Sequence, residues 1–210
     1  VSLVETCDDV DRLLADHAAS LETLLDFYTS TLRRVDRLHR ELEQAERALP
    51  IKKDGVEEVV PHARAAYRKF ADKVQDLFTR HLESSGWPPA GRLANADVFD
   101  KLVAPKLQES GRRVAIILVD ALRYELGVEL EKQLVDEGQV EVQAAFAQLP
   151  TTTPVGMASL LPGAGSDLRL LRTDDRMVVA MGEKALPQVT QRMDLLRQRY
   201  GQRFAQGKLN

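Results

Sequence analysis

The chain has 210 residues, 44% of them hydrophobic, which is enough to form the core of one large or two small domains. Disordered and fibrous classes are therefore excluded. The 29 basic residues nearly balance 32 acidic ones, and the net charge of −3 gives no sign of an obligatory nucleic-acid or membrane partner. With a single cysteine, Cys7, no run of about 18 apolar residues and no apolar signal core, we expect a soluble protein of the reducing cytoplasm, without a membrane partner.

The first half of the chain has helical periodicity. Apolar residues recur every three or four positions over residues 10–49, which predicts one long amphipathic helix. Pro50 ends this run, residues 52–55 supply a turn, and a second amphipathic run covers residues 59–82. The pattern favours an antiparallel helical hairpin. A coiled coil between two chains is the alternative, but the apolar stripe changes phase after Val35, which weakens that case.

A boundary follows the helical half. Residues 86–89, Gly-Trp-Pro-Pro, end the helical run as a loop, and a short helix over residues 98–107 leads to Ser110 and Gly111. We therefore expect a helical region over residues 1–110 and an α/β domain over residues 111–210.

The second half has the pattern of an α/β fold. Residues 114–119 form a continuous apolar, β-branched run, which is typical of a strand buried on both faces of a parallel sheet. A helix-like stretch over 121–135 and a second strand-like run over 140–149 follow with short connections. Together they predict a right-handed βαβ unit. A short strand over 177–181 and a basic helix over 188–204 complete the segment.

Polar residues follow both strong strand patterns, at the sheet edge where α/β proteins bind their ligands. Asp120 ends an otherwise apolar run, and it either caps the following helix or binds a metal. Thr153 precedes Pro154, so we expect Thr153 to be the N-cap of a helix. Such a helix start is common, but its hydroxyl and amides also suit a phosphate.

Two strings of residues then carry a family resemblance. Residues 117–125, Ile-Leu-Val-Asp-Ala-Leu-Arg-Tyr-Glu, and residues 149–163, Leu-Pro-Thr-Thr-Thr-Pro-Val-Gly-Met-Ala-Ser-Leu-Leu-Pro-Gly, strongly resemble the opening of a PglZ domain. PglZ domains belong to the alkaline phosphatase superfamily and occur in BREX and Pgl bacteriophage-defence systems. The resemblance covers residues 111–210.

The resemblance implies a catalytic site. Asp120 would be the first ligand of a centre of two divalent cations, with zinc the usual metal. Thr153 would be the nucleophile, bind a metal through its oxygen, and form a phosphothreonine that water hydrolyses. Thr152, Gly156 and Arg123 would contact the phosphate, although Arg123 is equally well explained as part of a salt-bridged helix face.

The chain departs from the superfamily pattern in its histidines. The superfamily completes its metal site with later aspartate and histidine ligands, whereas the four histidines here all precede Asp120, and we expect them on the surface of the helices: His17, His39, His62 and His81. Either the chain ends before the remaining ligands or its metal centre is degenerate. We expect the phosphatase-like domain to be truncated, because the chain begins at Val1 rather than Met and ends soon after a helix in an unfinished sheet. On this view the chain alone binds zinc incompletely and is inactive.

Two functions remain open. The first is a metal-dependent phosphohydrolase, a phosphodiesterase or a nuclease-like enzyme, that acts on a phosphorylated substrate in phage defence. Residues 169–210 hold 9 basic and 4 acidic side chains, which suits nucleic acid, although a solvated helix face is the commoner explanation. The second is a non-catalytic scaffold whose helices dock other defence-system proteins.

Overall fold

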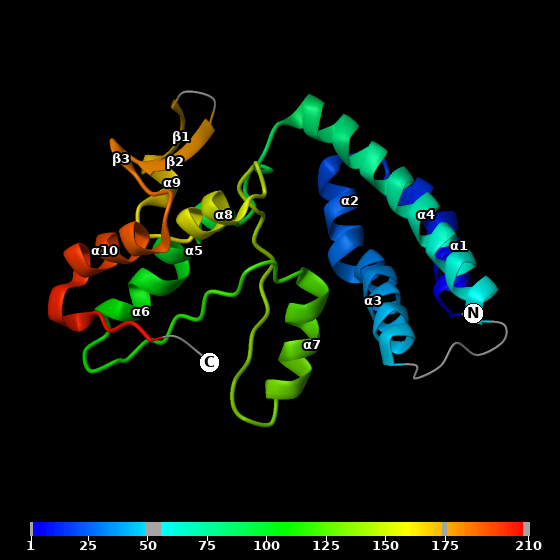
Figure 1. The fold of residues 1–210 in the computed structure, drawn as a ribbon, viewed down its shortest axis with the longest axis horizontal. Coiled ribbons are helices and arrows are strands. Elements are labelled where there is room, and N and C mark those ends of the chain that lie inside the picture. The colour runs from blue at the N-terminus through cyan, green and yellow to red at the C-terminus, as the bar shows by residue number, and fades with distance from the viewer. Residues whose placement is uncertain (1, 49–55, 174–175, 208–210) are drawn as a thin grey trace. The chain divides into compact units, whose positions relative to one another are not determined.

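The computed structural model describes residues 2–48, 56–173 and 176–207 (Figure 1). By its contacts the chain forms two compact units: Val1–Pro89 with Leu122–Ala144, and Ala90–Ala121 with Ala145–Asn210. The expected boundary after residue 110 concerns separately folding domains and stays a prediction. The compact units nevertheless group the chain differently, because residues 122–144 belong with the N-terminal helices.

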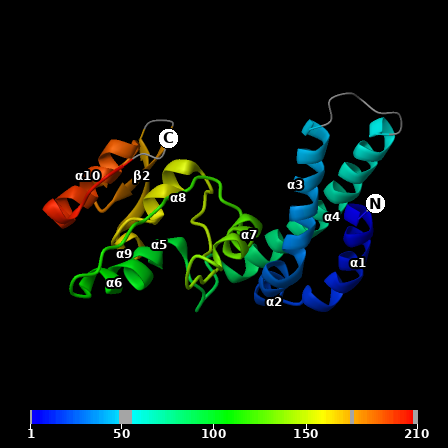
Figure 2. The same cartoon turned by 90° about the horizontal axis from the view of Figure 1, so that it is seen from below.

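The first unit is helical. The predicted second amphipathic helix is confirmed as a helix of 30 residues, and it packs antiparallel to the helix that precedes it (Figure 2). The turn expected at Pro50 and residues 52–55 lies outside the described residues. In chain order the elements are α1 Ser2–His17, α2 Leu21–Phe27, a π-helical turn Tyr28–Leu32, α3 Arg33–Ala48, α4 Val56–Ser85 and α7 Tyr124–Leu134.

The single helix expected over residues 10–49 is wrong. Helix α1 ends at His17, and Ser20 begins α2 as its N-cap, with its hydroxyl accepting a hydrogen bond from the Thr23 amide at 3.2 Å. A serine at this position satisfies an otherwise unpaired amide of the new helix, so a helix start is favoured there. The separate α1 then packs against both α3 and α4.

The core of the first unit lies between these helices. Leu14 and Val35 are each 1% exposed, and apolar side chains from α1 to α4 surround them. Helix α7 packs on α3. Among the described residues, no helix combines the length and the apolar character that crossing a bilayer requires.

The second unit holds the remaining short helices and a small sheet. The expected helix over 98–107 is found as one helical run from α5 through a π-helical turn to α6. The expected strand over 177–181 and the final helix are also confirmed, as β2 and α10. The elements are α5 Asn95–Val98, the turn Phe99–Val103, α6 Ala104–Gln108, α8 Thr153–Ser159, α9 Ala164–Asp167, β1 Leu168–Thr173, β2 Arg176–Met181, β3 Lys184–Ala185, α10 Val189–Tyr200 and a 3-10 turn Gly201–Arg203.

The sheet of the second unit is antiparallel, in the order β1-β2-β3. Leu168 pairs with Met181 and Thr173 with Arg176, while Ala180 pairs with Ala185. The inner part of β2 is buried against α8 and α9: Val179 and Ala180 are at most 2% exposed, and Leu186, just after β3, is fully buried.

The parallel βαβ unit is not found in the described residues. Residues 114–119 and 140–145 form no strand, and one parallel bridge joins Ala94 to Phe146. A strand needs neighbours to pair its backbone groups and cover both faces. Residues 114–119 have no such neighbours among the described residues, and Ile117 and Val119 are 68% and 52% exposed. The apolar pattern indicates that residues 114–119 are suited to burial, but it does not specify which strand would pair with them.

Candidate functional site

The structure brings Asp120 and Thr153 together. They lie 33 residues apart in the sequence, and the Thr153 hydroxyl donates to the Asp120 carboxylate, with Oγ1 3.1 Å from Oδ2 and 3.4 Å from Oδ1. Both belong to the second unit, and both are exposed. A carboxylate and an alcohol in contact and open to solvent can share a cation or a proton.

Short turns place these two side chains. Asp120 lies in a turn whose next residue, Ala121, has φ +53°, a left-handed conformation that residues other than glycine seldom adopt. Thr153 is the first residue of α8, and the structure makes Thr152 the N-cap, so the N-cap expected at Thr153 is wrong by one residue. The backbone explains the shift, because Thr152 is extended at φ −96° and ψ 149°, as an N-cap must be.

The buried face of α8 packs in the core of the second unit and so fixes the position of Thr153 at the start of this helix. Val155 is 4% exposed and Ala158 is fully buried, and both belong to the core of the second unit. Gly156 donates its amide to the Thr152 carbonyl at 2.9 Å, so the helix already uses this donor. The Thr152 hydroxyl makes no cap hydrogen bond and is exposed.

Arg123 lies in the first unit, at the N-cap of α7, and its guanidinium is 3.5 Å from the Glu125 carboxylate. The salt-bridged helix face that the sequence offered as one explanation of Arg123 is therefore found, but its partner Glu125 is buried, at 1% exposed. Its main partner is Arg40, whose Nε and Nη2 donate to the carboxylate at 3.0 and 3.1 Å. This pair holds the N-terminal turn of α7 against α3. Arg40 stands 85 residues earlier in the chain, and no local pattern links it to Glu125.

Of the four histidines expected on the surface of the helices, three are half-buried and make structural contacts. His17 stacks on Phe27, His39 stacks on Tyr67, and His81 Nε2 is 2.9 Å from the Ala18 carbonyl. His62 is exposed. All four lie in the helical unit.

Asp120 offers an anionic carboxylate and Thr153 a hydroxyl oxygen, and oxygen ligands of this kind suit a divalent cation. These two side chains could supply part of the coordination shell of such a cation. In the portion of the chain that the structure describes, no group of three histidine, cysteine, aspartate or glutamate side chains could hold a metal.

The basic segment near the C-terminus is only partly a charged face. Arg192 is 5% exposed, and its Nη1 donates to the Leu186 carbonyl at 3.2 Å. Burial lowers the pKa of this guanidinium. Arg192 therefore joins α10 to the chain that precedes it, rather than presenting a charge to solvent.

Comparison with known proteins decides the family. The family model of the BREX system PglZ alkaline phosphatase-like domain matches residues 98–204, just over half of the chain, and this range contains both Asp120 and Thr153. The chain belongs to the PglZ family. The resemblance seen in the two sequence strings is thereby confirmed.

Two PglZ-family relatives give the scale of the match. The alkaline phosphatase-like protein BrxZ of Escherichia coli O9:H4 (strain HS) is 37% identical over 79 residues, which cover 36% of this chain and 9% of that protein. The alkaline phosphatase-like protein PglZ of Bacillus cereus (strain H3081.97) is 30% identical over 113 residues, 46% of this chain and 13% of that protein. The matches therefore span about a tenth of the length of these relatives. No solved structure matches the chain significantly.

Proposed function

We propose that the chain carries part of the catalytic centre of a metal-dependent phosphohydrolase, a phosphodiesterase that acts in BREX bacteriophage defence. Thr153 is the nucleophile and Asp120 a metal ligand. One observation carries the proposal: within the segment that matches the PglZ domain, the Thr153 oxygen lies 3.1 Å from the Asp120 carboxylate. Exposure of both side chains leaves room for a phosphorylated substrate.

The chemistry follows from the position of the hydroxyl. Thr153 Oγ1 attacks phosphorus, the new O–P bond forms as the bond to the leaving group breaks, and Asp120 orients the hydroxyl through its hydrogen bond. The hydroxyl proton leaves to solvent, the leaving oxygen takes a proton from water, and a second water then hydrolyses the phosphothreonine. A divalent cation, zinc in our proposal, would supply charge neutralisation at the phosphate when bound by these two oxygens and further ligands.

Thr152 and Arg123 are the proposed substrate contacts. The Thr152 hydroxyl has no cap hydrogen bond, so it is available to a phosphate oxygen beside Thr153. Arg123 is the second proposed phosphate contact, and binding there would compete with its contact to Glu125. The Gly156 amide is not proposed as a direct donor to the phosphate, because it donates to the Thr152 carbonyl within α8.

The alternative function is a scaffold that assembles other BREX proteins. It is favoured by the helical unit, because residues 1–97 lie outside the PglZ match and apolar residues between Leu3 and Phe78 form a core of their own. The enzyme requires the Thr153 hydroxyl, whereas the scaffold does not.

The test compares Thr153→Ala with Thr152→Ala in the intact protein, supplied with zinc and bis(4-nitrophenyl) phosphate. We expect Thr153→Ala to abolish turnover and Thr152→Ala, which removes a proposed phosphate contact but not the nucleophile, to keep most of it. A quenched reaction should yield a phosphorylated peptide that contains Thr153. Asp120→Asn should lower the zinc content measured by mass spectrometry.

Two outcomes would contradict the proposal. If Thr152→Ala lost turnover and Thr153→Ala kept it, the nucleophile would be the neighbouring threonine. If the wild-type protein showed no turnover while its assembly with other BREX proteins survived all three substitutions, the scaffold function would be supported instead.

A further inference from the structure

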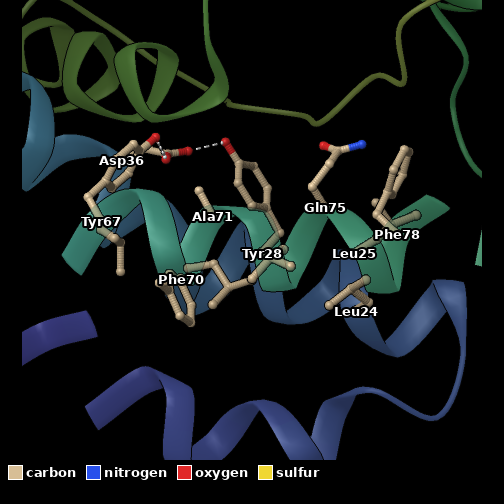
Figure 3. A pocket seen from close by; sticks show the side chains of 12 residues that line it. Leu24, Leu25, Tyr28, Asp36, Tyr67, Phe70, Ala71, Gln75 and Phe78 are labelled. Atoms are coloured by element: carbon tan, nitrogen blue, oxygen red, sulfur yellow. Dashed lines mark hydrogen bonds between the residues drawn. The ribbon is translucent and has the colours of Figure 1, made fainter. Parts of the chain in front are cut away.

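The helical unit contains a cavity that the proposed catalytic centre does not use. It has a volume of about 300 Å³ and lies between α2, the π-helical turn, α3 and α4 (Figure 3). This volume is at the lower limit for small-molecule pockets. All of its described lining residues fall within 24–78, outside the PglZ match.

The walls are apolar, and one end is polar. Most of the wall consists of aliphatic and aromatic side chains, among them Leu24, Leu32, Phe70, Val74 and Phe78. At the polar end, Asp36 Oδ2 accepts a hydrogen bond from the Tyr28 hydroxyl at 2.8 Å, and Oδ1 accepts one from Tyr67 at 3.0 Å. Figure 3 shows the carboxylate and the Tyr28 hydroxyl meeting at the same edge as the Gln75 amide.

The backbone at this cavity is unusual. Tyr28 and Leu32, both in the lining, are the first and last residues of the π-helical turn. Such turns are rare and occur frequently at functional sites. Here the turn places the Tyr28 ring where its hydroxyl reaches Asp36 from one side of the cavity, while Tyr67 reaches Asp36 from α4.

Charge decides the class of ligand. Of the described residues that line the cavity, Asp36 alone carries a formal charge, and within the described chain its carboxylate has no ion pair. Burial and Asp36 together raise the pKa of Tyr67 to about 12, and they also raise that of Tyr28, so both phenols remain neutral donors and leave the negative charge in place. Arg123 is the cation that acts on both tyrosines, and its ion-pair partner is Glu125.

We propose that this cavity binds a compact apolar ligand with a protonated amine, whose ammonium group is held by Asp36 and whose apolar part fills the space between α2 and α4. Each carboxylate oxygen accepts one tyrosine hydroxyl and keeps capacity for a further donor. The faces of the aromatic side chains at the cavity add cation–π attraction for an ammonium group.

The test is a calorimetric titration of the 210-residue chain with 2-phenylethylammonium, using neutral 2-phenylethanol as the matched ligand. We expect saturable binding of the amine with a dissociation constant of about 1 mM, and binding of the alcohol at least about tenfold weaker. Asp36→Asn should weaken the amine about tenfold and leave the alcohol unchanged. Asp72→Asn, at an exposed position of α4 that does not line the cavity, is the control and should change neither.

A second variant keeps the test independent of the Asp36 network. Ala71 lines the cavity, so Ala71→Leu should fill the space and abolish binding of both compounds, with circular dichroism confirming the helical fold. Absence of saturable amine binding up to about 10 mM would overturn the proposal. Equal binding of amine and alcohol, or unchanged amine binding in Asp36→Asn or Ala71→Leu, would also overturn it. None of these results depends on Thr153 or on turnover.

Discussion

The hydroxyl of Thr153 donates to Asp120 across 3.1 Å, although neither side chain is buried. The contact is therefore positioned by the backbone on each side: by the left-handed Ala121 after the aspartate, and by the buried face of α8 under the threonine. Residues placed in this way contribute little to the packing of the core. Substituting either residue should therefore impair function while leaving the free energy of unfolding almost unchanged.

Thr153→Ala should change the free energy of unfolding of the 210-residue chain by no more than about 0.5 kcal/mol, as expected for an exposed side chain outside the core. Val155→Ala, two residues further along α8, is the comparison. It removes buried methyl groups and should cost about 2 kcal/mol. Urea unfolding followed by circular dichroism measures both. A large loss in Thr153→Ala would mean that the hydroxyl has a structural role.

The pair Arg40 and Glu125 should behave in the opposite way. Glu125→Gln leaves the half-buried guanidinium without its charged partner, and breaking such a buried pair costs about 3 kcal/mol. Asp11→Asn breaks the exposed pair with Lys73 and should cost at most about 1 kcal/mol. Thermal unfolding of the wild type, Glu125→Gln and Asp11→Asn measures the two losses of stability.

The double variant Arg40→Met with Glu125→Met sharpens this prediction. Replacing both charges by apolar side chains of similar volume leaves no uncompensated charge, so it should recover part of the stability that either single substitution loses. Equal losses in Glu125→Gln and Asp11→Asn would contradict the importance of the buried pair.

Local sequence patterns predicted the elements that depend on local interactions. The second amphipathic run predicted α4, and the short apolar run over residues 177–181 and the basic helix expected over residues 188–204 correspond to β2 and α10. The helix break at Ser20 was missed because Leu14 and Leu21 are one heptad apart, so the apolar stripe continues across it. The capping pattern from Ser20 to Thr23 was the signal that could have revealed it.

Long-range relations could not be read from local hydrophobic patterns, and the one that was named in advance came from the family resemblance. The motif residues Asp120 and Thr153 were named in advance, and the structure brings them together. The partnership of Arg40 with Glu125 depends on α7 packing against α3, and the pairing of residues 114–119 depends on neighbouring strands. Hydrophobic pattern specifies that a face is suited to burial, but it does not specify what covers that face.

Alkaline pH should destabilise the helical unit through its tyrosines. Burial, followed by the neighbouring Asp36, raises the pKa of Tyr67 from 10.0 to about 12. Above pH 10 the unfolded chain releases this proton while the folded chain retains it, so the stabilisation present below pH 10 is lost as pH rises through 12. The loss for one such group is on the order of 2 kcal/mol.

Tyr67→Phe isolates this contribution. It should be less stable than the wild type at pH 8, because Asp36 loses a donor, but its stability should fall less steeply between pH 10 and 12. The buried Cys7 thiol, whose pKa burial raises to about 11, acts in the same direction in both proteins and cancels in the comparison. Urea unfolding midpoints at successive pH values provide the measurement. Parallel curves would contradict the assignment to Tyr67.

The left-handed backbone at Ala121 gives the last prediction. An alanine at φ +53° costs roughly 1 kcal/mol relative to its ordinary conformations, and glycine relieves this strain at some expense in chain entropy. Ala121→Gly should therefore keep or raise the free energy of unfolding by up to about 0.5 kcal/mol. Gly163→Ala is the reciprocal change, because Gly163 has φ +82°, which alanine adopts only under strain, so it should lose about 1 kcal/mol or more. If Ala121→Gly instead lost as much stability as Gly163→Ala, the turn after Asp120 would not be strained.

In the intact protein the same glycine should loosen the position of Asp120, the proposed zinc ligand. A fall in zinc affinity without a fall in melting temperature would show that the strained turn holds Asp120 in place.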